Sequence, residues 1–276
     1  MDLTRERLDI SRRVNFEPLE NKSILITGAT GFVGSWLSEG LRAANYQGVK
    51  YSTVMLDHEA FSYWMNGNFH QHYDYIIHLA PPFGPKIERR FEQCTPDTLF
   101  FASSGGVYHK EMNAYDTGKL HAENDLIAMN FPVKIARMFA FCGAYLRPDN
   151  FAIGNFVRNA WMGIPLEVFG DGKTIRSYMY GADLSVWLWN IILYGKEKQI
   201  YNVGSQHGIT LGELAHRVAG IVNPMSVVQF VKPDFWERAP YYVPITDLTR
   251  YELGLEETYD LEYQIAKYAE WIYETL

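Results

Sequence analysis

The sequence contains little cysteine, and this excludes several kinds of protein. Only two cysteines, Cys94 and Cys142, occur among 276 residues. Two cysteines cannot build the disulfide framework of a small secreted domain, nor supply the four thiolates of a cysteine-based zinc site. We therefore expect a cytoplasmic protein without a metal centre.

Long apolar runs and basic blocks are also absent. No segment approaches the roughly 18 consecutive apolar residues that indicate a membrane-spanning helix, so we expect no membrane partner. The net charge is -7 without a strongly basic stretch, so we expect no nucleic-acid partner. The first residues, MDLTRERLDISRRV, lack the apolar core of a secretory signal. They predict a short amphipathic helix that docks through Leu3, Leu8 and Ile10.

A glycine-rich turn is the most informative segment that is present. The apolar run 24–26 leads into TGATGFVG, with glycines spaced G-x-x-G-x-x-G, and apolar residues at helical spacing follow over 37–44. We expect Gly28 to permit a tight turn, Gly31 to let the backbone approach a pyrophosphate, and Gly34 to let the helix pack closely. The helix N-terminus would offer N–H groups to the phosphates. The alternative is a glycine turn that holds no ligand. The predicted cofactor contacts in this turn are Gly28, Thr30, Gly31, Phe32, Val33 and Gly34.

Strand and helix patterns alternate after this turn. Strands are predicted at 51–56, 73–80, 98–102 and 133–138, with a helix at 115–129. This alternation predicts an α/β fold with a Rossmann-like, doubly wound parallel sheet. Functional groups should gather at the carboxyl ends of its strands.

From about residue 146 the pattern changes to shorter elements. We therefore divide the chain into an N-terminal extension, a dinucleotide-binding domain and a small α/β substrate domain. Their predicted extents are 1–20 for the extension, 21–145 plus about 181–205 for the dinucleotide-binding domain, and 146–180 plus 206–276 for the substrate domain.

Asp57 follows the predicted second strand. An acidic residue roughly 20–30 residues beyond the glycines can accept hydrogen bonds from the adenosine ribose and repels the 2′-phosphate of NADP. Asp57 therefore favours NAD, with NADP as the alternative cofactor. Its alternative role is to cap the next helix. Leu79 and Ala80, at the end of the third predicted strand, are the remaining predicted cofactor contacts.

A Tyr-x-x-x-Lys pair places a phenol and an ammonium on one helix face. Tyrosine has a reference pKa near 10, and lowering it by about three units requires about 4 kcal/mol, which a lysine and a nicotinamide cation could supply together. A nearby serine could donate to the reacting oxygen. The chain has four such pairs: Tyr46/Lys50, Tyr115/Lys119, Tyr194/Lys198 and Tyr263/Lys267. Only one follows a strand that ends in Ser-Ser, so the predicted catalytic residues are Ser104, Tyr115 and Lys119, with Ser103 as the substitute for Ser104.

The segments TGATGFVG, SSGGVY and YDTGK together resemble the extended short-chain dehydrogenase/reductase family, in its nucleotide-sugar epimerase, dehydratase and 4-ketoreductase branch. GDGKTIRSY, YNVG and ELGL extend this resemblance from Ser23 to about Tyr259. The resemblance implies a nucleotide diphosphate sugar as substrate. It implies that Arg176 holds the diphosphate, aided by Arg238 and Asn155, although Arg176 in a surface ion pair is the alternative. The loop from Ser104 to Tyr115 is shorter than the resemblance implies, so Tyr108 and His109 are expected closer to the sugar.

The resemblance leaves the reaction open. Dehydratases of this family carry Asp-Glu directly after the serine, where this chain has Gly105 and Gly106, so a 4,6-dehydratase is disfavoured. We expect an NAD-dependent 4-epimerase or a 4-ketoreductase, acting by hydride transfer at one sugar carbon. The alternatives are a dehydratase-like enzyme and a catalytically silent protein that binds NAD or a nucleotide sugar.

Two further segments are also shorter than the resemblance implies. Residues 59–73 leave too little room for the usual third strand, which would lie at the sheet edge. Residues 81–97 leave room for one short helix at most, and Pro81, Pro82 and Pro85 disfavour even that. In the family a long helix here helps to form the homodimer, so we expect a homodimer through a different interface, or a monomer.

Overall fold

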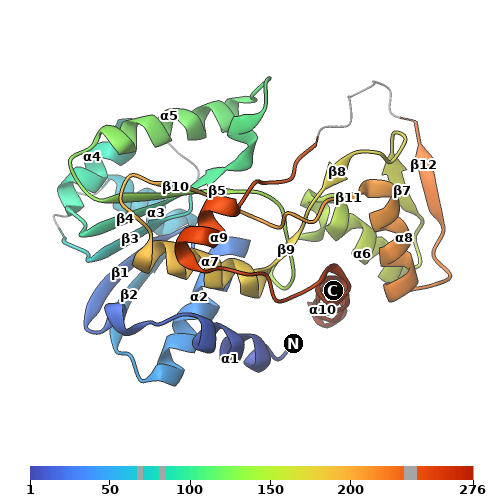
Figure 1. The fold of residues 1–276 in the computed structure, drawn as a ribbon, viewed down its shortest axis with the longest axis horizontal. Coiled ribbons are helices and arrows are strands. Elements are labelled where there is room, and N and C mark those ends of the chain that lie inside the picture. The colour runs from blue at the N-terminus through green and yellow to red at the C-terminus, as the bar shows by residue number, and fades with distance from the viewer. Residues whose placement is uncertain (67–70, 81–84, 233–240, 276) are drawn as a thin grey trace.

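A parallel sheet organises the first part of the chain in the computed structural model, which describes residues 1–66, 71–80, 85–232 and 241–275 (Figure 1). Its strand order is β10-β5-β4-β3-β1-β2, and every neighbouring pair is parallel. The strands are β1 (Lys22–Thr27), β2 (Tyr51–Leu56), β3 (Tyr75–His78), β4 (Thr98–Ser104), β5 (Val133–Met138) and β10 (Ile200–Val203). The predicted doubly wound α/β sheet is confirmed.

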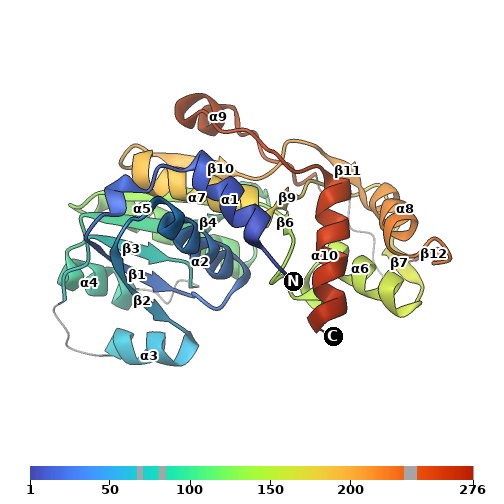
Figure 2. The same cartoon turned by 90° about the horizontal axis from the view of Figure 1, so that it is seen from below.

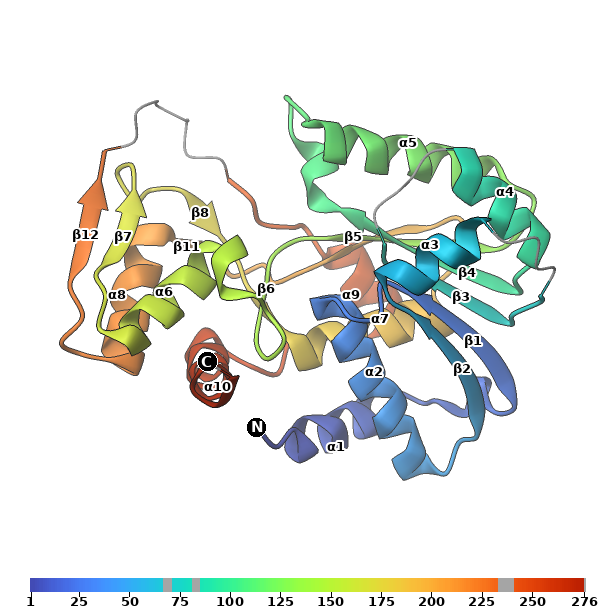
Figure 3. The ribbon, with the colours of Figure 1, turned by 180° about the vertical axis from the view of Figure 1, so that it is seen from behind.

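Helices cover both faces of this sheet. Figure 3 shows α1, α2 and α7 on one side and α3, α4 and α5 on the other. Their bounds are α1 (Thr4–Arg13), α2 (Phe32–Ala44), α7 (Gly181–Tyr194), α3 (His58–Asn66), α4 (Pro85–Cys94) and α5 (Ala114–Ala128). Alternate strand residues enter the two cores: Ile24 and Ile26 pack toward α2 and α7, whereas Leu25 packs on the opposite face.

The sheet ends at β2, as predicted from the short segment that follows it. Within the described residues β2 pairs with β1 alone, and only α3 lies between β2 and β3. An edge strand can be lost without exposing the hydrophobic centre of the sheet, because its removal leaves the inner strands covered on both faces. The predicted absence of the third strand is therefore confirmed for the described chain.

The segment before β4 forms a regular helix, although we predicted that its prolines would disfavour one. Helix α4 spans ten residues and begins at Pro85. Proline is tolerated in the first helical turn because its missing N–H has no helical partner there. Pro85 therefore begins the helix rather than disfavouring it, whereas Pro81 and Pro82 lie outside the described residues.

The second part of the chain has its own core between α6, α8 and α10. The remaining strands and α-helices of the described chain are β6 (Phe141–Cys142), α6 (Ala152–Met162), β7 (Leu166–Phe169), β8 (Ile175–Arg176), β9 (Met179–Tyr180), β11 (Ile209–Thr210), α8 (Leu211–Val222), β12 (Val228–Val231), α9 (Asp247–Leu253) and α10 (Leu261–Thr275). Short 3₁₀ helices are η1 (Glu17–Leu19), η2 (Asn45–Gln47), η3 (Gly105–Tyr108) and η4 (Pro148–Asn150). Helix α9 packs against α7 and β10. None of the helices in the described ranges is long and apolar enough to cross a membrane.

The N-terminal residues form the predicted helix, α1, which docks on α2 and α7. Leu3 and Ile10 are buried in this contact, but Leu8 is 40% exposed, so its predicted role in docking was wrong. Figure 2 shows the N-terminus beside α10, and the Met1 amino group pairs with Glu274 of that helix. The extension therefore touches both parts of the molecule.

Candidate active site

The glycine turn joins β1 to α2 at the carboxyl edge of the sheet. Gly28 has a φ of 71°, the left-handed region that side chains disfavour, and its N–H bonds the Leu56 carbonyl at 3.1 Å. Gly31 caps α2, and a Cβ built there meets only the Gly28 carbonyl oxygen, at 3.4 Å. The turn thus leaves a backbone cradle open at the positive end of α2, and this cradle fits the pyrophosphate of a dinucleotide.

The remaining predicted cofactor contacts surround this turn. A Cβ at Gly34 would lie 2.5 Å from the Gly28 carbonyl oxygen, so this glycine lets α2 pack on the turn itself rather than on the strand. A Cβ at Gly28 would meet the backbone of Leu79 and Ala80, which places the end of β3 beside the turn. The turn residues Thr30, Phe32 and Val33 are exposed or half-buried.

Asp57 lies directly after β2, whose last carbonyl bonds the Gly28 amide. Its Oδ1 accepts the backbone N–H of Ala60 at 2.8 Å, within the first turn of α3. The alternative role as a helix cap is therefore realised. A contact with the adenosine ribose stays a prediction.

Ser104 and Ser103 face different surroundings at the end of β4. The Ser104 hydroxyl donates to Asp116 Oδ1 at 3.1 Å and accepts the Gly106 N–H at 3.0 Å. The Ser103 hydroxyl is buried and donates to Glu123, which also pairs with Arg137. Ser104 is therefore the serine beside the N-terminal turn of α5, and Ser103 belongs to a buried ion-pair network.

Tyr115 and Lys119 lie on α5, with the lysine under the tyrosine. The Lys119 Nζ is 5.6 Å from the Tyr115 ring centroid and donates to the Ala102 carbonyl at 2.7 Å. Lys119 is 1% exposed, and this burial lowers the pKa of its ammonium to about 7. Tyr115 is 51% exposed.

The protein by itself does not lower the Tyr115 pKa. Partial burial and, secondarily, the neighbouring Asp116 carboxylate raise it. The lowering that the sequence argument requires must therefore come from a charge that a bound cofactor brings, together with Lys119 in its protonated form.

The other Tyr-x-x-x-Lys tyrosines have different surroundings. The Tyr194 hydroxyl donates to the Asn15 carbonyl, and the Tyr263 hydroxyl donates to buried Glu6. Tyr46, in η2, is as exposed as Tyr115 but lies after α2. Of the four pairs, Tyr115/Lys119 is the one that follows the Ser-Ser strand, and its catalytic role stays a prediction.

Tyr108 and His109 lie beside Ser104, in and just after η3. The Tyr108 hydroxyl donates to Asn202 at 3.0 Å, and the Arg137 guanidinium lies 4.6 Å from its ring centroid. The His109 Nδ1 is 3.9 Å from Asp116 Oδ2. The short loop thus brings both side chains to the carboxyl edge of the sheet, as expected from its length.

Tyr242 connects this edge to the predicted phosphate clamp. Its ring centroid lies 5.7 Å from the Arg176 guanidinium and 5.3 Å from the His109 ring, and burial raises its pKa to about 12. The sequence argument missed Tyr242 and Asp116, because no spacing rule relates them to Ser104. Arg238 lies outside the described residues.

Asn155 occupies a different place from Arg176. It lines a cavity of 430 Å³ on α6, and Arg176 is not among the described residues that line it. Phe151 and Phe169, both more than half exposed, also line this cavity, as does Arg158. Flat apolar faces beside amide and guanidinium groups suit a planar, polar ligand such as a nucleobase.

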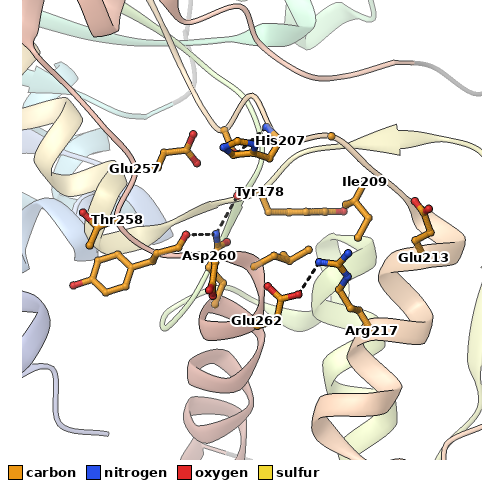
Figure 4. Close-up of a pocket in the computed structure, with 14 residues that line it drawn as sticks. Tyr178, His207, Ile209, Glu213, Arg217, Glu257, Thr258, Asp260 and Glu262 are labelled. Atoms are coloured by element: carbon orange, nitrogen blue, oxygen red, sulfur yellow. Dashed lines mark hydrogen bonds and ion pairs between the residues drawn. The ribbon is translucent and has the colours of Figure 1, made fainter.

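A larger cavity of 610 Å³ lies between α8, α10 and the loops before them (Figure 4). Of the predicted site residues that the structure describes, none lines it. Two ion pairs lie at its wall, Arg217 with Glu262 and Glu257 with Arg250, while Glu213 accepts the Thr210 hydroxyl and Asp260 accepts the Tyr263 N–H. The cavity therefore lies apart from the predicted site residues.

The described residues contain one cluster with metal-ligand geometry, formed by His72, Asp74 and Asp97. It lies at the amino end of β3, away from the glycine turn. The Asp74 carboxylate already accepts from Lys22 and Ser23, and these bonds hold its pKa well below its usual range although burial opposes them. This cluster is consistent with a structural role for Asp74.

The fold defines the class as a Rossmann-type α/β protein, and the comparisons refine it. Residues 89–204 match the model of the NAD dependent epimerase/dehydratase family. UDP-glucuronic acid decarboxylase 1 of Arabidopsis thaliana is 32% identical over 131 residues, covering 45% of this chain and 29% of that protein. UDP-N-acetyl-alpha-D-glucosaminuronate decarboxylase of Bacillus cytotoxicus is 24% identical over 310 residues, covering 86% of this chain and 96% of that protein.

A solved structure supports the same fold. The dTDP-glucose 4,6-dehydratase DesIV of Streptomyces venezuelae, a double mutant with NAD bound, superposes with a TM-score of 0.77 at 18% identity, covering 91% of this chain and 97% of that one. The predicted resemblance to the nucleotide-sugar epimerase and dehydratase family is therefore confirmed. The matches to three Arabidopsis decarboxylases span only 27% to 29% of those proteins.

Proposed function

We propose that this protein is an NAD-dependent nucleotide-sugar enzyme that transfers hydride at one sugar carbon, most simply C4. The observation that carries the proposal is the placement of Ser104, Tyr115 and buried Lys119 at the same sheet edge as the open glycine cradle. The family match and the NAD bound to a structural neighbour support the choice of cofactor.

NAD, when bound, supplies the hydride acceptor, and the cradle at Gly28–Gly34 would hold its pyrophosphate. Tyr115 takes the proton from the sugar hydroxyl as the carbon is oxidised and returns it on reduction. Protonated Lys119, 5.6 Å from the tyrosine ring, favours the phenolate. Arg176 would grip the sugar's diphosphate by donating two hydrogen bonds to it.

A decarboxylase is a second candidate, favoured by the two relatives described above. Oxidation at C4 of a nucleotide-linked hexuronic acid creates a ketone β to the C6 carboxylate. Such β-keto acids lose carbon dioxide readily, so the reaction needs no acid at Gly105 or Gly106. The same Ser-Tyr-Lys chemistry would then serve an epimerase, a reductase or a decarboxylase.

The test compares wild-type protein with Tyr115→Phe on UDP-glucose, UDP-N-acetylglucosamine, UDP-glucuronate and UDP-4-keto-6-deoxyglucose, with NAD and then NADH. We expect turnover to fall about a thousandfold in the variant, since general acid–base catalysis contributes on that order. NAD affinity should be unchanged. Tyr46→Phe, at an equally exposed tyrosine with the same lysine spacing, is the matched control and should keep full activity.

The products separate the candidate reactions. Inversion at C4 indicates an epimerase. Release of carbon dioxide from UDP-glucuronate indicates a decarboxylase. Net consumption of NADH with the keto sugar indicates a reductase. Wild-type protein that binds NAD but changes none of these nucleotide sugars would contradict the proposal and favour the catalytically silent alternative.

A further inference from the structure

The 610 Å³ cavity between α8 and α10 has an excess of negative charge in its wall. Four carboxylates line it: Glu213, Glu257, Asp260 and Glu262. Of the described residues that line it, Arg217 alone carries a permanent positive charge. Even when Arg250, which pairs with Glu257, is counted, the carboxylates outnumber the guanidinium groups by four to two. The cavity has the size of a small-molecule site, and its charge selects a cationic ligand.

Bonds within the protein use only part of the acceptor capacity of these carboxylates. In Glu213, Asp260 and Glu262, a single carboxylate oxygen accepts the bonds from the protein. The second oxygen of each has no donor among the residues that the structure describes. An ionised carboxylate offers about four acceptor positions. The wall therefore retains acceptors for a ligand that brings several donors.

A buried amide in the same wall also has an acceptor without a donor. Gln264 lines the cavity and is 2% exposed. Its Nε2 donates to the backbone carbonyls of Tyr178 and Tyr259 at 3.2 and 3.1 Å, which fixes the orientation of the amide. Its Oε1 has no partner in the described part of the chain. A buried acceptor without a hydrogen bond destabilises the folded state, and a ligand N–H group at this wall would relieve that loss.

An aromatic ring lies among the carboxylates. Figure 4 shows the Tyr178 ring with Glu257 on one side and Glu213 on the other, and with the Arg217–Glu262 pair below it. Tyr178 is 5% exposed, and burial raises the pKa of its phenol, which keeps the ring neutral. A cation is attracted to the face of a neutral aromatic ring. The arrangement therefore suits an apolar chain on the ring with positive charges on either side of it.

The spacing of the acidic groups distinguishes an organic cation from a metal ion. Direct coordination needs three or more ligand atoms close to one another, and within the described ranges only His72, Asp74 and Asp97 meet this condition. The carboxylates that line the cavity do not converge in this way. An extended cation can reach separate carboxylates, whereas a divalent metal ion requires its ligands around one point.

We propose that this cavity binds a linear aliphatic polyamine. Its ammonium groups would donate to the free oxygens of Glu213 and Glu262, and its methylene chain would lie along Tyr178. The site goes beyond the proposed nucleotide-sugar chemistry and does not depend on it, because none of the predicted site residues that the structure describes lines the cavity. Since the wall combines α8 with the start of α10, an occupied cavity would hold these two helices together.

The experiment titrates wild-type protein with spermidine and with putrescine by isothermal calorimetry at pH 8, where aliphatic ammonium groups are charged. We expect one spermidine to bind per chain. Putrescine should bind about tenfold more weakly because it carries one charge less, and salt should weaken both interactions by screening.

Three variants test the location of the site. Glu213→Gln should weaken spermidine binding about tenfold, because it removes a charged hydrogen-bond acceptor. Glutamine can replace glutamate in the capping box that begins α8, so the helix should remain intact. Arg217→Gln removes the cation from the wall and should strengthen binding about fivefold. Glu197→Gln changes the net charge equally at an exposed position outside the cavity and should have no effect.

The opposite directions of the two cavity variants protect the test, because misfolding would weaken binding in both. Absence of saturable binding to wild type would overturn the proposal, as would equal weakening by Glu213→Gln and Glu197→Gln. Failure of Arg217→Gln to bind more tightly would also contradict it. Displacement of spermidine by Mg²⁺ at constant ionic strength would assign the cavity to a metal ion instead.

Thermal unfolding gives a second readout. A ligand that binds only the folded protein raises its Tm as the ligand concentration increases. Spermidine should raise the Tm of wild type and Glu197→Gln equally, and that of Glu213→Gln less. Equal rises in all three proteins would overturn the proposal. Neither measurement involves turnover, so its failure would leave the proposed function untouched.

Discussion

Lys119 lies buried beneath Tyr115, and burying its ammonium group lowers the stability of the folded protein. Its side chain lies almost wholly inside the protein, between the Phe101 ring and the Ala102 carbonyl. Burial disfavours the charged form, which is the form needed to stabilise a phenolate. The same burial therefore links the site to the pH dependence of folding.

We predict that Lys119→Met changes this pH dependence. The lysine keeps its proton to about pH 10.5 when unfolded but loses it near pH 7 when folded. Between those values the unfolded chain binds more protons, so the free energy of unfolding rises with pH, by about 2 kcal/mol from pH 7 to pH 9 from this group alone. Below pH 7 the lysine is protonated in both states, and its contribution no longer changes.

The measurement is urea unfolding of wild type and Lys119→Met at pH 7, 8 and 9. Methionine keeps the apolar bulk and cannot titrate. The difference in stability between variant and wild type should therefore shrink as the pH rises. Parallel plots of unfolding free energy against pH for the two proteins would contradict the prediction. Burial also lowers the pKa of Lys134, but this residue is present in both proteins, so its contribution cancels when they are compared at each pH.

Helix α1 is joined to the rest of the molecule by a buried ion pair. Its Arg13 donates to Asp183 of α7 at 2.7 Å and to the Glu256 carbonyl. Asp183 is fully buried and also accepts the backbone N–H groups of Thr258 and Tyr259. This ion pair thus connects α1, α7 and the segment that leads to α10.

We predict that Arg13→Ala lowers the free energy of unfolding by about 3 kcal/mol, because it leaves a buried carboxylate without its cation. Burial already raises the Asp183 pKa against the effect of Arg13, so the loss should be greatest at a pH well above that raised pKa, where the carboxylate is ionised. Chemical denaturation of wild type and variant measures this loss of unfolding free energy. Arg12→Ala, at the exposed neighbour on α1, should cost little, and equal losses for both arginines would contradict the role of the buried pair.

At the scale of the whole molecule, the proposed substrate site would draw on groups from both parts of the chain. The glycine cradle and Tyr115 belong to the sheet layer, whereas Arg176 lies on β8 of the second part and meets the first through Tyr242. NAD and the nucleotide sugar would therefore depend on different parts of the protein, and substitutions should separate the two affinities.

We predict that Arg176→Gln weakens UDP-glucose binding at least tenfold and leaves NAD affinity unchanged. Hydrogen bonds between charged groups contribute about 1.5–3 kcal/mol, which corresponds to about a tenfold to hundredfold change in affinity. Isothermal titration with each ligand measures the effect. Arg217→Gln removes an exposed ion pair with Glu262 and is the control. A similar loss of both ligands in Arg176→Gln would point to a disturbed fold instead.

Much of the architecture followed from the sequence because its signals are local. Alternating apolar residues determine which strand faces are buried, and the three glycines determine a turn that few other sequences can adopt. Counting residues between Asp57 and Asp74 was enough to predict the missing edge strand. The same counting underestimated α4, because the effect of a proline depends on whether it begins a helix or interrupts one.

The sequence by itself determined the parallel sheet, its missing edge strand and the glycine turn, whereas its choice of one Tyr-x-x-x-Lys pair among four stays a prediction. Only the tertiary structure decided that Asp116 reaches the space beside Gly106, that Asp57 caps α3, and that Ser103 belongs to the Glu123–Arg137 network. The physical reason is that periodicity and turn chemistry act between neighbours in the chain. A hydrogen bond between Ser104 and Asp116 depends instead on how β4 and α5 pack, and no spacing in the sequence encodes that distance.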